Sequence, residues 1–100
     1  MQRHFTYILC SQKNGTLYVG STHNLARRIY EHQQKLVPGF SSKYNVCILV
    51  HAEEFSLMMD AVKREKVLKT WNRQWKIDLI EQHNPEWKDL SHDLLFISNE

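Results

Sequence analysis

The chain has 100 residues, of which 42% are hydrophobic and 24% are charged, and its formal net charge is +2. This length suggests one domain with a modest core, and the hydrophobic fraction argues against an intrinsically disordered chain. No apolar run approaches the roughly 18 residues that a membrane span needs, and residues 1–10 lack the apolar segment and cleavage site of a signal peptide. We therefore expect a cytoplasmic protein with no membrane partner.

The charges are distributed unevenly along the chain. Basic residues predominate in 1–52 and again in 63–76, whereas acidic residues collect between Asp78 and Glu100. This pattern fits a polyanion-binding face opposite a solvated face, and it also fits ordinary charge on helix surfaces. The two cysteines, Cys10 and Cys47, lie in apolar runs without zinc-ligand spacing, which predicts buried free thiols.

The first half of the chain reads as a hairpin followed by a helix. Residues 5–11, "FTYILCS", and 16–20, "TLYVG", are rich in β-forming residues, and Asn14-Gly15 between them predicts a tight turn. Thr22 is the expected N-cap of a helix over 24–36, whose apolar face includes Leu36.

The second half reads as a strand followed by two helices. Pro38-Gly39 ends the first helix, and the run 46–55, which is apolar through Val50 and then turns polar, predicts a third strand. Ser56 is the expected cap of a helix over 57–71, whose apolar stripe includes Met58, and Asn72 is the expected cap of a helix over 73–83.

The remaining segment is expected to dock on this body through Trp87 and Leu90 and then to fray. We therefore expect a single domain over residues 1–90 with a C-terminal tail over 91–100. Three strands with helices packed on them make a small α/β layer structure of the α+β type.

Glu65 is the first candidate functional residue, because it falls within the apolar stripe of the helix over 57–71. A carboxylate there is costly unless a cation or strong hydrogen-bond donors neutralise it. A divalent metal ion would do so, and so would Arg64, Lys69 or a tyrosine hydroxyl. Both interpretations stay open from the residues alone.

Four other candidates come from the hairpin and the helix after it. Tyr7 and Tyr18 lie on paired strands, where they are either ordinary β-formers or catalytic phenols activated by a nearby cation. Arg28 and His32 are four residues apart and share a helix face, while Arg27 points about 100° away. A guanidinium can clamp a phosphate, and an imidazole can position a phenol or accept a proton.

These residues together resemble a known pattern. The chain carries "TYI" on its first strand, "YVG" on its second, an arginine eight residues after the glycine, a histidine four residues later, and a helical glutamate. This is similar to the GIY-YIG nuclease superfamily over nearly the whole chain. Segments such as "YVGSTHNLARRIYEH", "KREKVLKTWNRQWKIDLIE" and "NPEWKDL" resemble its small stand-alone bacterial endonuclease subgroup most closely.

The resemblance implies a three-stranded antiparallel sheet flanked by helices, and hydrolysis of DNA phosphodiesters with one divalent metal, Mg²⁺ or Mn²⁺. It implies that Arg28 stabilises the phosphate and that Glu65 holds the metal. It also implies that Tyr7, aided by His32 or a metal-bound water, helps to deprotonate the attacking water, and that Tyr18 holds a water or the scissile phosphate. By position the site comprises Tyr7, Tyr18, Gly20, Arg28, His32 and Glu65.

Two features depart from the family pattern or limit it. Phe5 replaces the first glycine of the family motif and Thr6 replaces its isoleucine, which affects strand packing rather than the reacting groups. The chain also has no room for a separate DNA-binding domain, so a protein partner could supply target choice. The loop with Phe40, Lys43 and Tyr44 is expected to contact substrate or simply to be anchored by its aromatic residues.

Two alternatives to an endonuclease remain. One is a nucleic-acid-binding module that keeps the scaffold without turnover. The other is a protein-interaction domain that uses Trp71, Trp75 and Trp87, although such tryptophans more often belong to a core. The pathway stays open among repair, recombination and defence.

Overall fold

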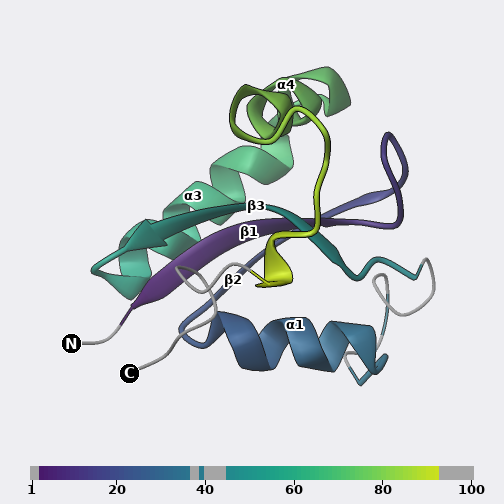
Figure 1. Cartoon of the computed structure of the whole chain (residues 1–100). Coiled ribbons are helices and arrows are strands. Elements are labelled where there is room, and N and C mark those ends of the chain that lie inside the picture. Colours follow the sequence, from purple (N-terminus) through teal and green to yellow (C-terminus); the bar gives the residue numbers. More distant parts are fainter. Residues whose placement is uncertain (1–2, 37–38, 40–44, 93–100) are drawn as a thin grey trace.

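A computed structural model describes residues 3–36, 39 and 45–92 of the chain, and it contains one antiparallel sheet with helices on both faces (Figure 1). The strand order is β2-β1-β3, so the first strand is central and the other two form the edges. This confirms the α+β class and the three-stranded antiparallel sheet. The elements are β1 (His4–Cys10), β2 (Leu17–Thr22), α1 (Leu25–Gln33), β3 (Ile48–Phe55), α3 (Met58–Thr70), α4 (Arg73–His83) and the 3₁₀ turn η1 (Leu90–His92).

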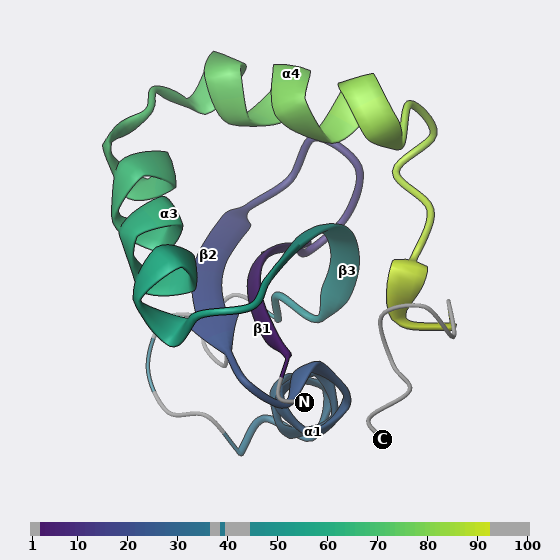
Figure 2. The same ribbon diagram turned by 90° about the vertical axis from the view of Figure 1, so that its left-hand side faces the viewer.

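Side-chain alternation along the strands divides the core into two layers. Phe5, Tyr7 and Leu9 of β1 pack with α1, whereas Ile8 and Cys10 pack with the helices of the opposite face. The first layer is completed by Leu25, Ile29, Val46 and Leu49, and the second by Val19, Val50, Leu68, Ile80 and Trp87. In Figure 2, which looks along the axis of α1, β2 lies between α1 and α3.

The hairpin between β1 and β2 forms as expected around Asn14, although only this residue of the Asn-Gly pair has positive φ, at 61°. The amide of Gly15 donates to the carbonyl of Gln12 over 2.8 Å. Arg73 from the start of α4 then donates to the carbonyls of Asn14 and Gly15, at 2.7 and 2.6 Å. The turn is thus tied to α4 as well as to its own strands.

The expected cap and length of the first helix are wrong in detail. Asn24 rather than Thr22 is the N-cap of α1, because the Asn24 side chain accepts the amide of Arg27. Thr22 is the last residue of β2, and its hydroxyl accepts a hydrogen bond from the amide of Asn24. This bond shapes the turn between β2 and α1. The helix ends at Gln33, so Leu36 lies beyond it and is exposed.

The next helix also begins differently from the expectation. No side chain caps α3 at Leu57, so the expected cap at Ser56 is wrong, and Met58 is exposed rather than part of a buried stripe. The sheet covers only a narrow strip of α3, and the buried residues of this helix are Ala61 and Leu68. The expected cap at Asn72 is confirmed, since its side chain accepts the amide of Trp75 over 2.9 Å.

The segment after α4 docks on the sheet as expected. Trp87 is buried and its indole donates to Glu81 over 2.8 Å, while Leu90 packs against the layer shared with α1. The expectation that all three tryptophans are core residues is wrong for Trp75, whose side chain is exposed. Of the tail, residues 93–100 lie outside the described part of the chain, so its expected fraying stays a prediction.

The cysteines and the helices agree in part with expectation. Cys10 and Cys47 are both free, but only Cys10 is buried, because Cys47 lies just before β3 and is half-buried. Among the helices described, none is long and apolar enough to cross a lipid bilayer.

A charged cluster fastens α3 to the edge strand β3. Arg64 donates through Nε and Nη2 to the Glu53 carboxylate at 2.8 and 3.2 Å, and Nε2 of the buried His51 lies 2.8 Å from the same carboxylate. The Arg64 guanidinium also lies over the Trp71 ring, 5.1 Å from its centroid. Burial alone would raise the pKa of Glu53, but the hydrogen bonds from His51 and Arg64 outweigh it and lower the pKa to about 2.

We expect the Glu53→Gln variant to reveal this cluster through its pH dependence. Because folding lowers the pKa of Glu53, its stabilisation is present above about pH 4.5 and is lost as the pH falls toward 2. Urea unfolding should show Glu53→Gln less stable than wild type by about 1–3 kcal/mol at pH 6, with the difference shrinking at pH 3. The more exposed Glu54→Gln is the matched control. An equal loss at both pH values would contradict this role for the Glu53 charge.

Candidate active site

Gly20 gives the Tyr7 phenol its place on the sheet. Tyr7 of β1 pairs with Gly20 of β2 in the antiparallel register, and Tyr18 pairs with Leu9. A Cβ atom on residue 20 would lie 2.5 Å from the Tyr7 hydroxyl oxygen, closer than real contacts allow. The Tyr7 ring can therefore lie across β2 only because residue 20 has no side chain. Gly20 thus acts on the site by leaving space.

His32 from α1 closes over the two phenols. Its Nε2 lies 3.3 Å from the Tyr7 hydroxyl oxygen, and its ring meets the Tyr18 ring edge-on with centroids 5.0 Å apart. The Tyr7 and Tyr18 ring centroids are 6.3 Å apart. His32 and Tyr7 are both buried, whereas Tyr18 is half-buried at the side of the cluster. The structure thus brings together the three aromatic residues that the sequence singled out.

Burial keeps both members of the Tyr7–His32 contact neutral. It is the main cause that raises the pKa of Tyr7 far above its usual range, with a further rise from Tyr18 and a smaller opposing effect of Arg28. Burial and, to a smaller extent, the positive charge of Arg28 lower the pKa of His32 to about 4. A protonated phenol therefore faces a neutral imidazole, and it can donate to Nε2 when the ring proton is on Nδ1.

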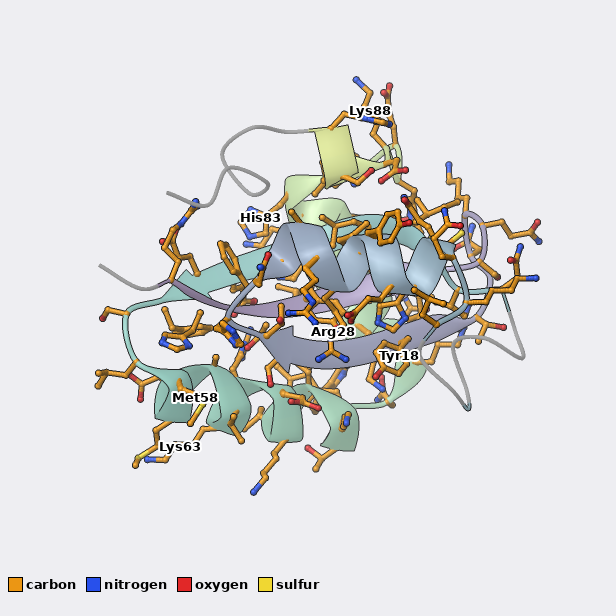
Figure 3. The ribbon with its side chains drawn as sticks, turned by 90° about the horizontal axis from the view of Figure 1, so that it is seen from below. Tyr18, Arg28, Met58, Lys63, His83 and Lys88 are labelled. Carbon is orange, nitrogen blue, oxygen red and sulfur yellow. The ribbon has the colours of Figure 1, made fainter. Side chains whose placement is uncertain are left out.

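Arg28 lies at the mouth of this cluster. It extends from α1 over β2 toward α3, with Tyr18 beside it (Figure 3). Its Nε is 3.5 Å from Glu31, which also accepts a hydrogen bond from the more exposed Arg27 at 3.2 Å. Because Glu31 is shared between two arginines and the Arg28 side chain remains 38% exposed, the Arg28 guanidinium can still reach an external anion.

Glu65 comes from the other face of the sheet. The Ser21 hydroxyl, one residue after Gly20 on β2, donates to Glu65 Oε1 over 2.5 Å. Lys69 Nζ donates to Oε2 over 2.7 Å, so the Lys69 contact that the sequence left open does form. Arg64 is instead occupied by Glu53. Glu65 is close enough for its charge to raise the pKa of Tyr7, and its side chain is 20% exposed rather than sealed in the core.

One carboxylate and one hydroxyl oxygen suit Mg²⁺ or Mn²⁺ better than a metal that needs a full protein cage. Among the residues that the structure describes, no three His, Cys, Asp or Glu side chains gather into a metal-binding group. Mg²⁺ keeps several waters and is commonly held by one or two carboxylates together with substrate phosphates. The Glu65 carboxylate, aligned by Ser21 at the edge of β2, fits that requirement.

One residue of the site, Ser21, is not among the residues predicted from the sequence, and some predicted residues lie outside the described part of the chain. Ser21 was not singled out, yet strand alternation after Gly20 places it on the face opposite Tyr7 and toward α3, which is the signal that identifies it. Lys43 and Tyr44, expected to contact substrate, lie outside the described residues together with Phe40.

We expect NMR titration of the His32 ring to show a midpoint near pH 4, well below the usual value of about 6.5. Arg28→Gln should raise that midpoint, because the cation that opposes protonation is gone, whereas Arg27→Gln should change it less. The sign has a consequence for stability: a histidine whose pKa falls on folding favours the unfolded state as the pH drops from about 6.5 toward 4. A midpoint near 6.5 in the wild type would contradict the buried, neutral imidazole.

Comparisons with known proteins identify the family of the chain. The GIY-YIG catalytic domain matches residues 3–78. A UPF0213 protein of Staphylococcus haemolyticus is 34% identical over 82 residues, which cover 82% of this chain and 99% of that protein. A UPF0213 protein of Syntrophus aciditrophicus is 38% identical over 88 residues, covering 86% and 98%.

The fold also has a solved counterpart. The solution NMR structure of a UPF0213 protein from Bacillus halodurans superposes with a TM-score of 0.55 at 24% identity, covering 96% of this chain and 99% of that one. At that identity the likeness concerns the fold alone. The sequence matches carry the assignment: the chain belongs to the GIY-YIG nuclease family, among its small stand-alone UPF0213 members.

Proposed function

We propose that this protein is a metal-dependent endonuclease that hydrolyses phosphodiester bonds in DNA. The observation that carries the proposal is the convergence at β2 of two phenols, a neutral imidazole and an accessible guanidinium on one face with a carboxylate on the other. Family membership supplies the reaction class. The catalytic set would be Tyr7, Tyr18, Arg28, His32 and Glu65, with Gly20 leaving room for the phenol.

Arg28 would bind the scissile phosphate. Its planar guanidinium offers paired donors to two phosphate oxygens and can balance the charge that builds up in the transition state. Binding the phosphate would also free Arg28 from its 3.5 Å contact with Glu31. Tyr18, half-buried beside Arg28, would hold the attacking water or a phosphate oxygen.

The contact between Tyr7 and His32 would handle the proton of the attacking water. In the free protein neither group is a strong base at neutral pH, because the phenol is protonated and the pKa of His32 is about 4. Arg28 is one cause of the low His32 pKa, and a phosphate bound to Arg28 would offset its charge. Substrate binding would therefore raise the basicity of His32 at the step where a proton must leave the water through Tyr7.

Glu65, with Ser21 beside it, would hold the divalent ion. When bound, that ion supplies Lewis-acid polarisation of a phosphoryl oxygen and neutralises charge on the leaving group. Lys69 would have to release Oε2 of Glu65 or share it, and as an exposed side chain it can move at little cost. Mg²⁺ and Mn²⁺ both suit this oxygen site.

DNA is thus the proposed partner, contacted by the basic part of the chain, and a second protein would supply target choice. We place the protein in the cytoplasm, where free thiols such as Cys10 and Cys47 persist. Residues 1–90 would form the whole catalytic unit. Its use in repair, recombination or defence depends on which DNA structure is cleaved.

One observation favours the alternative of a DNA-binding module without turnover. Both oxygens of Glu65 accept hydrogen bonds from Ser21 and Lys69, which is how a purely structural carboxylate would be satisfied. A structural role predicts that metal has no effect on DNA binding or cleavage. The two functions therefore differ in their response to Mg²⁺ or Mn²⁺.

We expect nicking of plasmid, flap or branched DNA in Mg²⁺ or Mn²⁺ and none in chelator. Arg28→Gln and Glu65→Gln should each lower the cleavage rate by about 10²-fold or more, as loss of a charge-stabilising group does. Arg27→Gln, the neighbouring exposed arginine, and Glu54→Gln, an exposed glutamate on β3, are the matched controls.

Thermal unfolding of every variant shows whether the fold is intact. Salt-sensitive DNA binding by folded wild-type protein with no cleavage of any of these substrates in either metal would instead support the binding module.

A further inference from the structure

A hollow of about 160 Å³ adjoins the candidate active site, between the start of α3 and the turn from β2 into α1. Arg28 forms one wall and Ser21, the hydrogen-bond partner of Glu65, forms another. Two histidines, His4 and His23, also line it, and neither takes part in the chemistry proposed above. The remaining lining residues are Thr22, Met58, Ala61 and Val62, so no acidic side chain is among them.

His4 has an unusual hydrogen-bonding state. Its Nδ1 is buried and has no hydrogen-bond partner within the described residues. A buried N–H without an acceptor is rarer in proteins than an unsatisfied acceptor, so the neutral ring is expected to leave Nδ1 unprotonated and to carry its proton on Nε2. The imidazole is then a donor at its other nitrogen. A histidine that lines a hollow and whose one nitrogen is unpaired calls for a functional explanation.

Two other hollows among the described residues differ from this one because each contains a glutamate. One, of about 540 Å³ at the β3 edge, contains Glu53, whose carboxylate is already in contact with Arg64 and His51. Another, of about 220 Å³ beside α1, includes Glu31. An anion entering either would meet a carboxylate. The hollow with His4 and His23 is lined by an arginine, two imidazoles and two hydroxyl groups, and no carboxylate is among its lining residues.

Its position suits a nucleic acid strand that passes over Arg28. His4 lies three residues before Tyr7 on β1, about 10 Å along the strand, and like Ser21 it belongs to the face of the sheet toward α3. Arg28 lines this hollow, and it is also the residue proposed to bind the scissile phosphate, so an anion beside His4 would be a neighbour of that phosphate. The facing helix contributes Met58, whose exposed thioether borders the hollow (Figure 3).

We propose that the hollow of His4, His23 and Arg28 binds the phosphate that flanks the scissile phosphate of a DNA strand. The proposal rests on the proposed function, since it names a second contact for the same substrate. His4 and His23 position the strand through its backbone, so they add affinity without base specificity.

The test is binding of a short fluorescent oligonucleotide by anisotropy, without divalent metal so that no cleavage intervenes. We expect His4→Ala and His23→Ala each to weaken binding several-fold, and the double variant about tenfold, because each variant removes a hydrogen-bond donor to the DNA backbone. His83→Ala is the matched control, because His83 is an exposed histidine in the hollow at the β3 edge and should leave affinity unchanged. His23 lies on an exposed turn, so His23→Ala carries the test even if His4→Ala fails to fold.

A second probe locates the contact on the DNA. Oligonucleotides that each carry one neutral methylphosphonate linkage, moved along the strand, should include one that wild type and the double variant bind equally. Equal affinity of wild type and both single variants for normal DNA, an equal loss in His83→Ala, or no binding by wild type would each overturn the subsite. Failure of the proposed function is separate, because it appears as absent cleavage in Mg²⁺ or Mn²⁺ while this metal-free binding is unaffected.

Discussion

The close packing of the Tyr7 phenol over Gly20 is the contact on which the site depends. It occurs at an edge strand with helices on both sides, so side chains from α1 and α3 can reach the same stretch of β2 (Figure 2). Because successive residues of β2 point to opposite faces, Gly20 accommodates Tyr7 on one face while Ser21 holds Glu65 on the other. Two adjacent residues of one strand thereby align a phenol and a carboxylate that come from opposite layers of the core.

Burial and one guanidinium set the electrostatics of that site. Burial keeps Tyr7 and His32 neutral. Burying these two polar groups costs less free energy because they contact each other. Arg28 biases both groups, lowering the pKa of the phenol and that of the imidazole, and it is itself only loosely held by Glu31. In the free protein the Arg28 charge is partly balanced by Glu31. A phosphate bound to Arg28 would change the electrostatic environment of Tyr7 and His32, the residues proposed to act on the substrate.

The sequence predicted what depends on local pattern and missed what depends on packing between elements. Strand alternation, the Asn14 turn and the cap at Asn72 are encoded by neighbouring residues, and all of them appear in the structure. The cap of α1 moved from Thr22 to Asn24 because β2 runs two residues further than expected. Met58 is exposed because the sheet covers only a narrow strip of α3, which no periodicity along that helix could show. The convergence of Glu65 with Tyr7 came from family resemblance rather than pattern, since contacts across 44 residues, such as that from Ser21 to Glu65, leave no local signal.

The most direct measurement of the central claim is a Mn²⁺ titration of ¹⁵N-labelled protein followed by NMR, with a short DNA duplex added afterwards. Paramagnetic broadening falls steeply with distance, so it locates the ion without any need for turnover. We expect the amides of Gly20, Ser21 and Glu65 to broaden first, more strongly with DNA present, and Glu65→Gln to abolish the effect. Broadening centred on Glu53 at the opposite edge of the sheet, or broadening at β2 that survives Glu65→Gln, would contradict a metal site formed by Glu65 beside the phenols.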